Sequence, residues 1–168
     1  GEFIGKVLLK FLQKNFNLAK GKNRTGILGV ATGGRGALLT SAHFAGKFKA
    51  AAGLSGDYDP LSMTNDRLLS SVYGEYKNFK ERWEKEDNVL KMAAKFKSVA
   101  LFIGHGGKDH KVPSGQSFVL ILKLKQLKSK YGGYNFVYHI QKKYRHDWKV
   151  WRLMLEPMMV FFDTNLKK

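Results

Sequence analysis

The pattern in this 168-residue chain that could carry chemistry is a glycine-rich turn, Gly29-Val30-Ala31-Thr32-Gly33-Gly34. Its spacing is that of G-x-S-x-G, in which a serine lies on a sharp strand-to-helix turn with its hydroxyl exposed as a nucleophile. Glycines flank the nucleophile because side chains at those positions would collide with neighbouring backbone. Alanine stands at the position of the serine, and a methyl group cannot attack a carbonyl. The sequence therefore predicts the scaffold for a nucleophile without the nucleophile itself.

An acid and then a histidine follow this turn along the chain. Chains that use such a serine place both residues on loops after later strands, in that order. Asp109 lies in the segment from His105 to Pro113, and His146 lies in Arg145-His146-Asp147-Trp148. Asp109 and His146 are therefore the candidate acid and base.

The elements that would position these residues alternate between strand and helix. Four apolar runs are suited to buried parallel strands: Thr25 to Val30, Phe48 to Leu54, Ser98 to Gly104 and Tyr134 to Ile140. Helix formers with apolar residues at helical spacing fill Arg35 to Phe44, and another helix is expected from about Ser114. Helical spacing resumes through Trp151, Leu155 and Phe162. This order predicts an α/β fold with a mostly parallel sheet and flanking helices.

Three motifs together resemble one family. The glycine turn resembles G-x-S-x-G-G, Gly104 to Pro113 resembles an acid loop, and His146-Asp147-Trp148 with Trp151 resembles the histidine loop G-H-D-W-x-x-W. These are the motifs of the esterase D-like family of the α/β-hydrolases, which includes feruloyl esterases, S-formylglutathione hydrolases and mycolyltransferases. The resemblance runs from near the N-terminus to about Asp163 and implies the α/β-hydrolase fold.

The resemblance also implies roles for the site residues. It makes Ala31 the nucleophile position, His146 the general base and acid, Asp109 the residue that orients the imidazole, and the backbone N–H of Thr32 an oxyanion donor. The implied substrate is a small-molecule ester, hydrolysed through an acyl-enzyme without a cofactor. With Ala31 the chain is expected to be inactive. Two explanations stay open: a substitution that inactivates an esterase, or a natural pseudoenzyme that binds without chemistry.

Length raises a separate expectation, since α/β domains with this motif order commonly run to about 200–250 residues. Residues Glu2 to Phe16 form a predicted helix just before the nucleophile strand, with an apolar stripe of Phe3, Ile4, Val7, Leu8, Phe11 and Leu12. By resemblance, residues 1–168 are expected to be the C-terminal part of a single α/β-hydrolase domain. The N-terminal strands and the second oxyanion loop would then belong to a missing N-terminal segment or a companion chain. The edge of the first strand would otherwise be open.

Composition limits the partners without choosing a function. The net charge is +17, from 30 lysines and arginines against 13 acids. The lysines recur at intervals along predicted helices, as in Lys123, Lys125, Lys128 and Lys130, which is typical of a solvated face. No nucleic-acid-binding module is recognisable, so no specific nucleic-acid partner is expected. No run approaches the roughly 18 to 20 apolar residues of a membrane helix. The absence of cysteine excludes disulfides and thiolate metal sites.

A dehydrogenase is the rival interpretation from another class. Thr32-Gly33-Gly34-Arg35-Gly36 follows a strand, and Tyr73 to Lys77 matches Y-x-x-x-K. A dinucleotide site needs an acidic ribose partner about 20 residues after its glycines, and Lys49 to Leu54 supplies none. This interpretation is therefore set aside.

Two other acids and two other histidines are further candidates for site residues. Asp57 and Asp59 are alternative acids, but Asp109 fits the chain order and the loop better. His105 and His110 flank Asp109 in the predicted loop, yet their spacing is a poor match to a metal site. We therefore expect no metal.

Between Asp57 and Lys97 the sequence predicts a covering layer of short helices. They are expected over Asn65 to Tyr73 and Lys77 to Lys85, with Asn88 capping a third over Val89 to Phe96. In the histidine loop, Trp148 is expected to pack against the loop.

Overall fold

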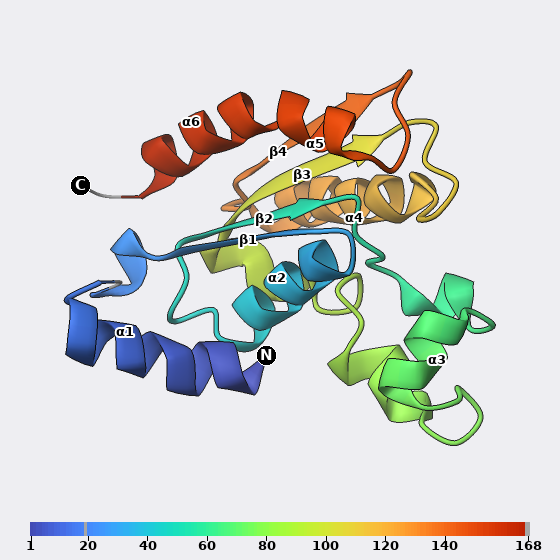
Figure 1. The fold of residues 1–168 in the computed structure, drawn as a ribbon, viewed down its shortest axis with the longest axis horizontal. Coiled ribbons are helices and arrows are strands. Elements are labelled where there is room, and N and C mark those ends of the chain that lie inside the picture. The colour runs from blue at the N-terminus through green and yellow to red at the C-terminus, as the bar shows by residue number, and fades with distance from the viewer. Residues whose placement is uncertain (19, 167–168) are drawn as a thin grey trace.

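The computed structural model describes residues 1–18 and 20–166 and has an open parallel sheet at its centre (Figure 1). Its strands are β1 (Gly26–Val30), β2 (Ala50–Leu54), β3 (Ala100–Gly106) and β4 (Phe136–Gln141). They lie in the spatial order β1-β2-β3-β4, and each neighbouring pair is parallel. The prediction of a parallel sheet with these four strands is confirmed.

Helices cover both faces of the sheet. Helices α2 (Thr32–His43) and α4 (Gly115–Tyr131) pack on one face, and α5 (Trp148–Leu153) and α6 (Leu155–Asn165) pack on the other (Figure 1). Because side chains alternate along a strand, β2 contributes Ala51 to the first layer and Ala50, Ala52 and Leu54 to the second. The central strands β2 and β3 are therefore buried on both faces, as strands of parallel sheets generally are, whereas the outer strands β1 and β4 are only partly covered.

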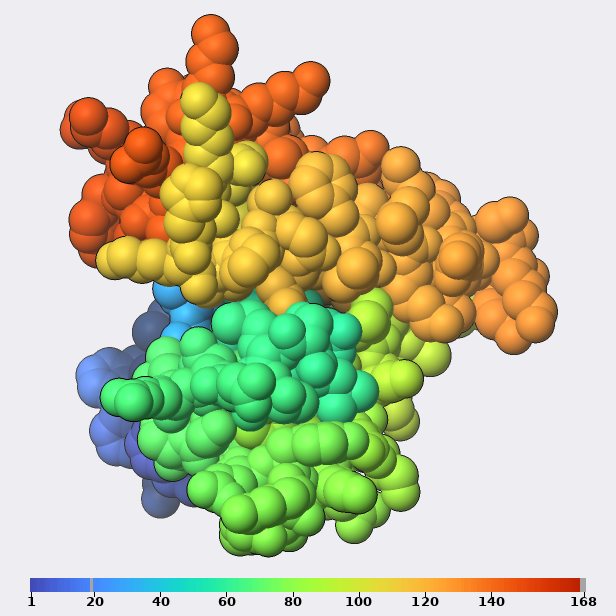
Figure 2. Space-filling model, turned by 90° about the vertical axis from the view of Figure 1, so that its right-hand side faces the viewer, coloured from blue at the N-terminus to red at the C-terminus, as the bar shows by residue number. Residues whose placement is uncertain are grey.

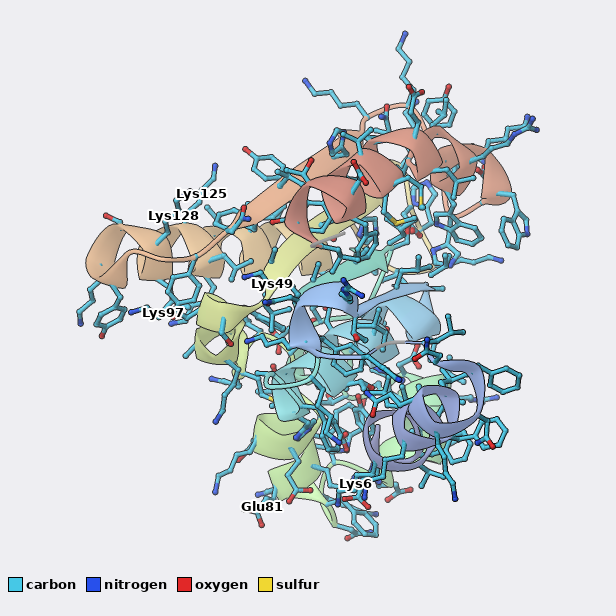
Figure 3. The ribbon with its side chains drawn as sticks, turned by 90° about the vertical axis from the view of Figure 1, so that its left-hand side faces the viewer. Lys6, Lys49, Glu81, Lys97, Lys125 and Lys128 are labelled. Atoms are coloured by element: carbon cyan, nitrogen blue, oxygen red, sulfur yellow. The ribbon has the colours of Figure 1, made fainter. Side chains whose placement is uncertain are left out.

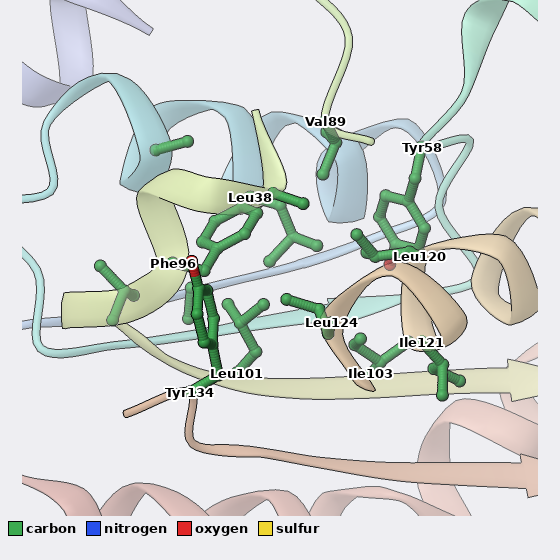
Figure 4. Packing of buried hydrophobic residues seen from close by; sticks show 14 of the residues in the cluster. Leu38, Tyr58, Val89, Phe96, Leu101, Ile103, Leu120, Ile121, Leu124 and Tyr134 are labelled. Atoms are coloured by element: carbon green, nitrogen blue, oxygen red, sulfur yellow. The ribbon is translucent and has the colours of Figure 1, made fainter. Parts of the chain in front are cut away.

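The larger hydrophobic cluster lies between the sheet and the layer of α2 and α4 (Figure 4). Leu101 and Ile103 from β3 pack against Leu38 of α2 and Leu120 of α4, and all four side chains are buried. The short 3₁₀ helix η5 (Ala93–Ser98) closes this cluster. This core fixes the strand ends that carry the candidate site.

The first part of the segment between β2 and β3 forms short helices that pack on one another around Leu69, Tyr73 and Trp83, instead of forming the predicted layer over the sheet (Figure 1). They are η3 (Pro60–Met63), α3 (Arg67–Tyr73) and η4 (Arg82–Glu86). The predicted helix over Asn65 to Tyr73 is confirmed with a later start, because the Asp66 side chain caps it by accepting from the Leu69 N–H.

The other two helices predicted in this segment were wrong in extent. Of the run from Lys77 to Lys85, only the part from Lys80 onward is helical, and it continues into η4. The helix predicted over Val89 to Phe96 begins only at Ala93, as the 3₁₀ helix η5, and the residues before it form turns. There the Leu90 N–H donates to the Tyr58 carbonyl. Asn88 does cap a turn, since its side chain accepts from the Lys91 N–H.

The N-terminal segment forms η1 (Phe3–Leu8) and α1 (Leu9–Phe16), and the turn η2 (Lys22–Arg24) leads into β1. The predicted apolar stripe is only partly covered, because Phe3, Val7 and Phe11 are exposed. Among the described residues β1 pairs with β2 alone, so its other edge is free.

Lysines gather at the sheet edge where the strands begin. Lys49 directly precedes β2, and Lys97 lies in η5 shortly before β3. Lys125 and Lys128 lie on the second half of α4 (Figure 3). This face is opposite the edge where the candidate site residues follow the strands.

Candidate active site

Ala31 occupies a backbone conformation that alanine rarely adopts. Its φ is 53° and its ψ is −127°, directly between the end of β1 and the start of α2. The Ala31 N–H donates to the Leu54 carbonyl of β2 at 2.7 Å, and the Ala31 carbonyl accepts from the Gly34 N–H at 2.8 Å. A non-glycine residue held at positive φ costs about 1–3 kcal/mol, and such residues cluster at functional sites. The elbow backbone is thus present although the side chain is a methyl.

The glycines around Ala31 differ in whether the backbone leaves room for a side chain. A Cβ on Gly29 would lie 2.0 Å from the Gly33 carbonyl oxygen, and one on Gly34 would lie 2.9 Å from the Leu54 carbonyl oxygen. A Cβ on Gly33 would meet nothing within 4 Å. The expectation of a collision on both sides of position 31 is therefore confirmed at Gly29 and wrong at Gly33.

Asp109 and His146 are hydrogen-bonded. The distance from His146 Nδ1 to Asp109 Oδ2 is 2.6 Å, and the other carboxylate oxygen accepts from the N–H groups of Lys111 and Val112 at 2.9 Å each. The carboxylate is fully buried, and the imidazole is 11% exposed. Because a carboxylate only accepts, Nδ1 carries the proton and Nε2 is left as the acceptor. An acid that fixes the histidine tautomer in this way is the arrangement general-base catalysis requires.

Trp151 connects His146 to the end of β2, where the backbone accepts a hydrogen bond from Ala31. Its ring meets the His146 ring edge-on, with 5.1 Å between centroids, and its Nε1–H donates to Ser55 Oγ at 3.1 Å. Ser55 directly follows Leu54, whose carbonyl accepts from the Ala31 N–H. The expected packing of Trp148 against the histidine loop is confined to one contact, an edge-on meeting with the Trp151 ring at 5.2 Å between centroids. Trp148 is otherwise 77% exposed, and it is Trp151 that contacts His146.

The three predicted positions lie at one edge of the sheet. Ala31 follows β1, Asp109 follows β3 and His146 follows β4, and the carboxyl ends of parallel strands meet at the same edge. Figure 2 views this side: the yellow acid loop lies beside the orange histidine loop, above the green segment between β2 and β3. Thr32 is the first residue of α2, so its N–H has no partner within the helix.

The alternative acids are engaged elsewhere. Asp57 forms a buried ion pair with Arg35 of α2, a contact that no local sequence pattern indicates. Burial raises the pKa of Asp57, and the Arg35 charge opposes that shift. Asp59 caps η3 by accepting from the Leu61 N–H and also accepts from the Asn88 amide.

His105 is the site residue whose place was predicted wrongly. Strand β3 continues through Gly106, so His105 lies in a buried strand and not in a loop. Its Nε2 lies 3.2 Å from Asp109 Oδ2, while His110 is exposed.

Within the described residues, no group of three or more histidine or acidic side chains is arranged to hold a metal ion. No helix in residues 1–18 or 20–166 has both the length and the apolar character to cross a bilayer.

A parallel sheet, a positive-φ turn after β1 and an acid–histidine pair at the same edge are together the arrangement of the α/β-hydrolase fold. The chain belongs to the Esterase family, described as "Putative esterase", whose sequence profile matches residues 1–162. The resemblance inferred from the motifs is thereby confirmed.

Solved structures agree on the fold. A ferulic acid esterase is similar with a TM-score of 0.74 and 18% identity, over 96% of this chain and 59% of that one. The S-formylglutathione hydrolase FrmB of Staphylococcus aureus has a TM-score of 0.69 and 16% identity, over 92% of this chain and 60% of that one. An acylaminoacyl peptidase of Pyrococcus horikoshii has a TM-score of 0.75 and 26% identity, over 98% of this chain and 27% of that one.

The chain thus spans about three fifths of the length of the ferulic acid esterase and the S-formylglutathione hydrolase, 59% and 60%. None of the curated proteins is a significant match to the chain.

Proposed function

We propose that this chain forms the catalytic portion of a carboxylic-ester hydrolase in which position 31 is the nucleophile position. The single observation that carries the proposal is the 2.6 Å hydrogen bond from His146 to Asp109 at the sheet edge where the Ala31 backbone holds a φ of 53°. A non-glycine residue at positive φ is uncommon, and a nucleophile at position 31 would give both the turn and the acid–histidine pair a use.

With serine at position 31, the proposed reaction proceeds through an acyl-enzyme. The imidazole of His146 takes the hydroxyl proton at Nε2 while the serine oxygen attacks the ester carbonyl carbon. The tetrahedral oxyanion accepts a hydrogen bond from the Thr32 N–H, and its collapse breaks the bond to the alcohol oxygen, which receives the proton. Water then attacks the acyl-enzyme by the same proton transfers. Asp109 stabilises the imidazolium that forms each time.

With alanine at position 31, the proposed chemistry stops at binding. A dismantled triad retains roughly 10³ to 10⁴ over water from binding and oxyanion contacts. The present chain is therefore proposed to bind an ester without turning it over at a useful rate.

A second polypeptide segment is part of the proposal. The free edge of β1 exposes Leu28, which is 51% accessible, and unpaired edges of apolar parallel strands are normally covered. We propose that an N-terminal segment or a companion chain pairs with this edge and supplies the second oxyanion donor. The esterase structures that extend beyond the matched region are consistent with this arrangement.

Ala31 itself favours one alternative function, a non-catalytic binding protein built on the esterase scaffold. In that case the pair of Asp109 and His146 serves packing alone. Restoring the hydroxyl distinguishes the two functions.

The test is hydrolysis of p-nitrophenyl acetate and butyrate by the full-length protein carrying Ala31→Ser. We expect a gain in kcat of at least about 10³ over the Ala31 form, and its loss when His146→Ala is added. Circular dichroism verifies that all three forms are folded. A folded Ala31→Ser protein that hydrolyses neither ester would contradict the proposal and favour the binding protein.

A further inference from the structure

A second histidine, His105, approaches the same carboxylate oxygen of Asp109 as His146 does. The His105 side chain is completely buried in β3, and its Nε2 lies 2.9 Å from the Val112 carbonyl oxygen and 3.2 Å from Asp109 Oδ2. Its other nitrogen, Nδ1, lies 2.7 Å from Ser117 Oγ on the first turn of α4. Three elements therefore meet on one imidazole: the strand, the acid loop and the following helix.

The partners fix where the protons lie. A carbonyl and a carboxylate oxygen only accept, so Nε2 of His105 carries the proton. Burial lowers the pKa of His105, which keeps the ring neutral although the Val112 carbonyl and Asp109 favour its charged form. A neutral ring protonated at Nε2 accepts at Nδ1, so the Ser117 hydroxyl donates to it. The ring is held at both ends and cannot flip without losing both bonds.

His105 reaches Asp109 by two routes. The first is direct, because the Nε2–H edge faces Asp109 Oδ2, the same oxygen that accepts from His146. The second passes through Val112, whose carbonyl accepts from His105 while its N–H donates to Asp109 Oδ1. Both carboxylate oxygens are thereby fixed, and the rotation of the carboxylate is fixed with them.

We propose that His105, oriented by Ser117, is a positioning residue that holds Asp109 with Oδ2 directed at His146. The effect of this positioning on turnover rests on the proposed function. Its effect on the hydrogen bond between Asp109 and His146 does not. Ser117 serves this positioning and not as a second nucleophile, because it is completely buried and no substrate reaches it.

The first experiment needs no activity and uses the protein with Ala31 in place. Proton NMR with ¹⁵N-labelled histidine follows the Nδ1 proton of His146, assigned by its disappearance in His146→Gln. We expect His105→Leu to shift this resonance upfield and broaden it by exchange with water. His105→Gln, which keeps an amide donor at a similar reach, should restore it. The matched control is His139→Leu, a histidine on β4 stacked on Phe102 that should leave the resonance in place.

The second experiment measures ester hydrolysis in the Ala31→Ser background. We expect His105→Leu to lower kcat about tenfold at unchanged KM, as when one hydrogen bond to a charged group is lost, and His105→Gln to recover most of it.

The two experiments separate the two proposals. An unchanged His146 resonance in a folded His105→Leu protein would overturn the positioning role, even if the melting temperature fell. Inactivity of the Ala31→Ser protein alongside a shifted resonance would overturn the proposed function and leave the positioning role standing.

Discussion

The two halves of the candidate site are built in different ways. In the elbow half, the backbone carries the geometry: Ala31 holds its positive φ through bonds between main-chain atoms, and no side chain takes part. In the acid half, side chains carry the geometry, through a buried cluster of Asp109, His146, His105 and Ser117.

This difference explains how the site can lose its nucleophile and keep its shape. Exchanging a hydroxyl for hydrogen at position 31 removes no contact that holds the turn, because the turn is closed by the N–H and carbonyl of that residue. Removing any one member of the acid half leaves buried partners without their bonds, at a cost of about 1–3 kcal/mol for each group. The elbow is therefore tolerant of side-chain change at position 31, and the acid half is not.

The largest effect that the comparison predicts is on turnover in the acid half. In the Ala31→Ser background, Asp109→Asn should lower kcat by about 10⁴, because an amide can present its NH₂ to His146 and stabilise the wrong tautomer. Initial rates on p-nitrophenyl butyrate measure this loss. The matched control is Asp147→Asn. The Asp147 side chain, next to His146 in the sequence, caps α5 by accepting from the Val150 N–H. Asparagine caps a helix as well as aspartate does, so this variant should keep its activity. Comparable losses in both variants would contradict the assignment of the acid.

The second prediction concerns stability in the elbow half. Gly29→Ala should destabilise the fold by about 3 kcal/mol or more, because its Cβ would lie 2.0 Å from a backbone oxygen that no rotamer change can move. Gly33→Ala is the matched control, with open space around the new methyl and no positive φ, and should be neutral within about 1 kcal/mol. Urea denaturation monitored by tryptophan fluorescence measures both. A similar loss for the two variants would show that the elbow is not closed by its backbone.

The same division decides how much the sequence could predict. The elbow, the four strands and the chain order of Asp109 and His146 were predictable because each depends on local patterns: a glycine spacing, an apolar run or a motif. The role of Thr32 as an oxyanion donor is not tested by the fold and stays a proposal.

Contacts between distant segments were not predictable in the same way. The ion pair of Arg35 with Asp57 and the bond of His105 to Ser117 join residues on separate elements, and neither spacing carries a helical or strand period. His105 was assigned to a loop because the glycines that follow it suggested a turn, whereas β3 continues to Gly106 by pairing with β4. Pairing with a neighbouring strand overrode the local preference.

The smallest predicted effect is a pH dependence of stability confined to the acid half. The pKa of His105 is lowered in the folded state by burial, against an ordinary unfolded value of about 6.5. Above that unfolded value the ring is neutral in both states, and its contribution to stability is complete. As the pH falls, the unfolded chain binds the proton first, so the contribution is lost on the way down to the lowered folded pKa. The difference in the free energy of unfolding between the protein and its His105→Gln variant should therefore shrink by about 1 kcal/mol when the pH is lowered from 7.5 to 5.5. Urea denaturation of both proteins at each pH measures the difference, in which the other titrating groups cancel. A difference that stays constant with pH would mean that the pKa of His105 is not lowered in the fold. A difference that grows as the pH falls would mean that folded His105 takes up the proton first, and Ser117 would then accept from its ring instead of donating to it.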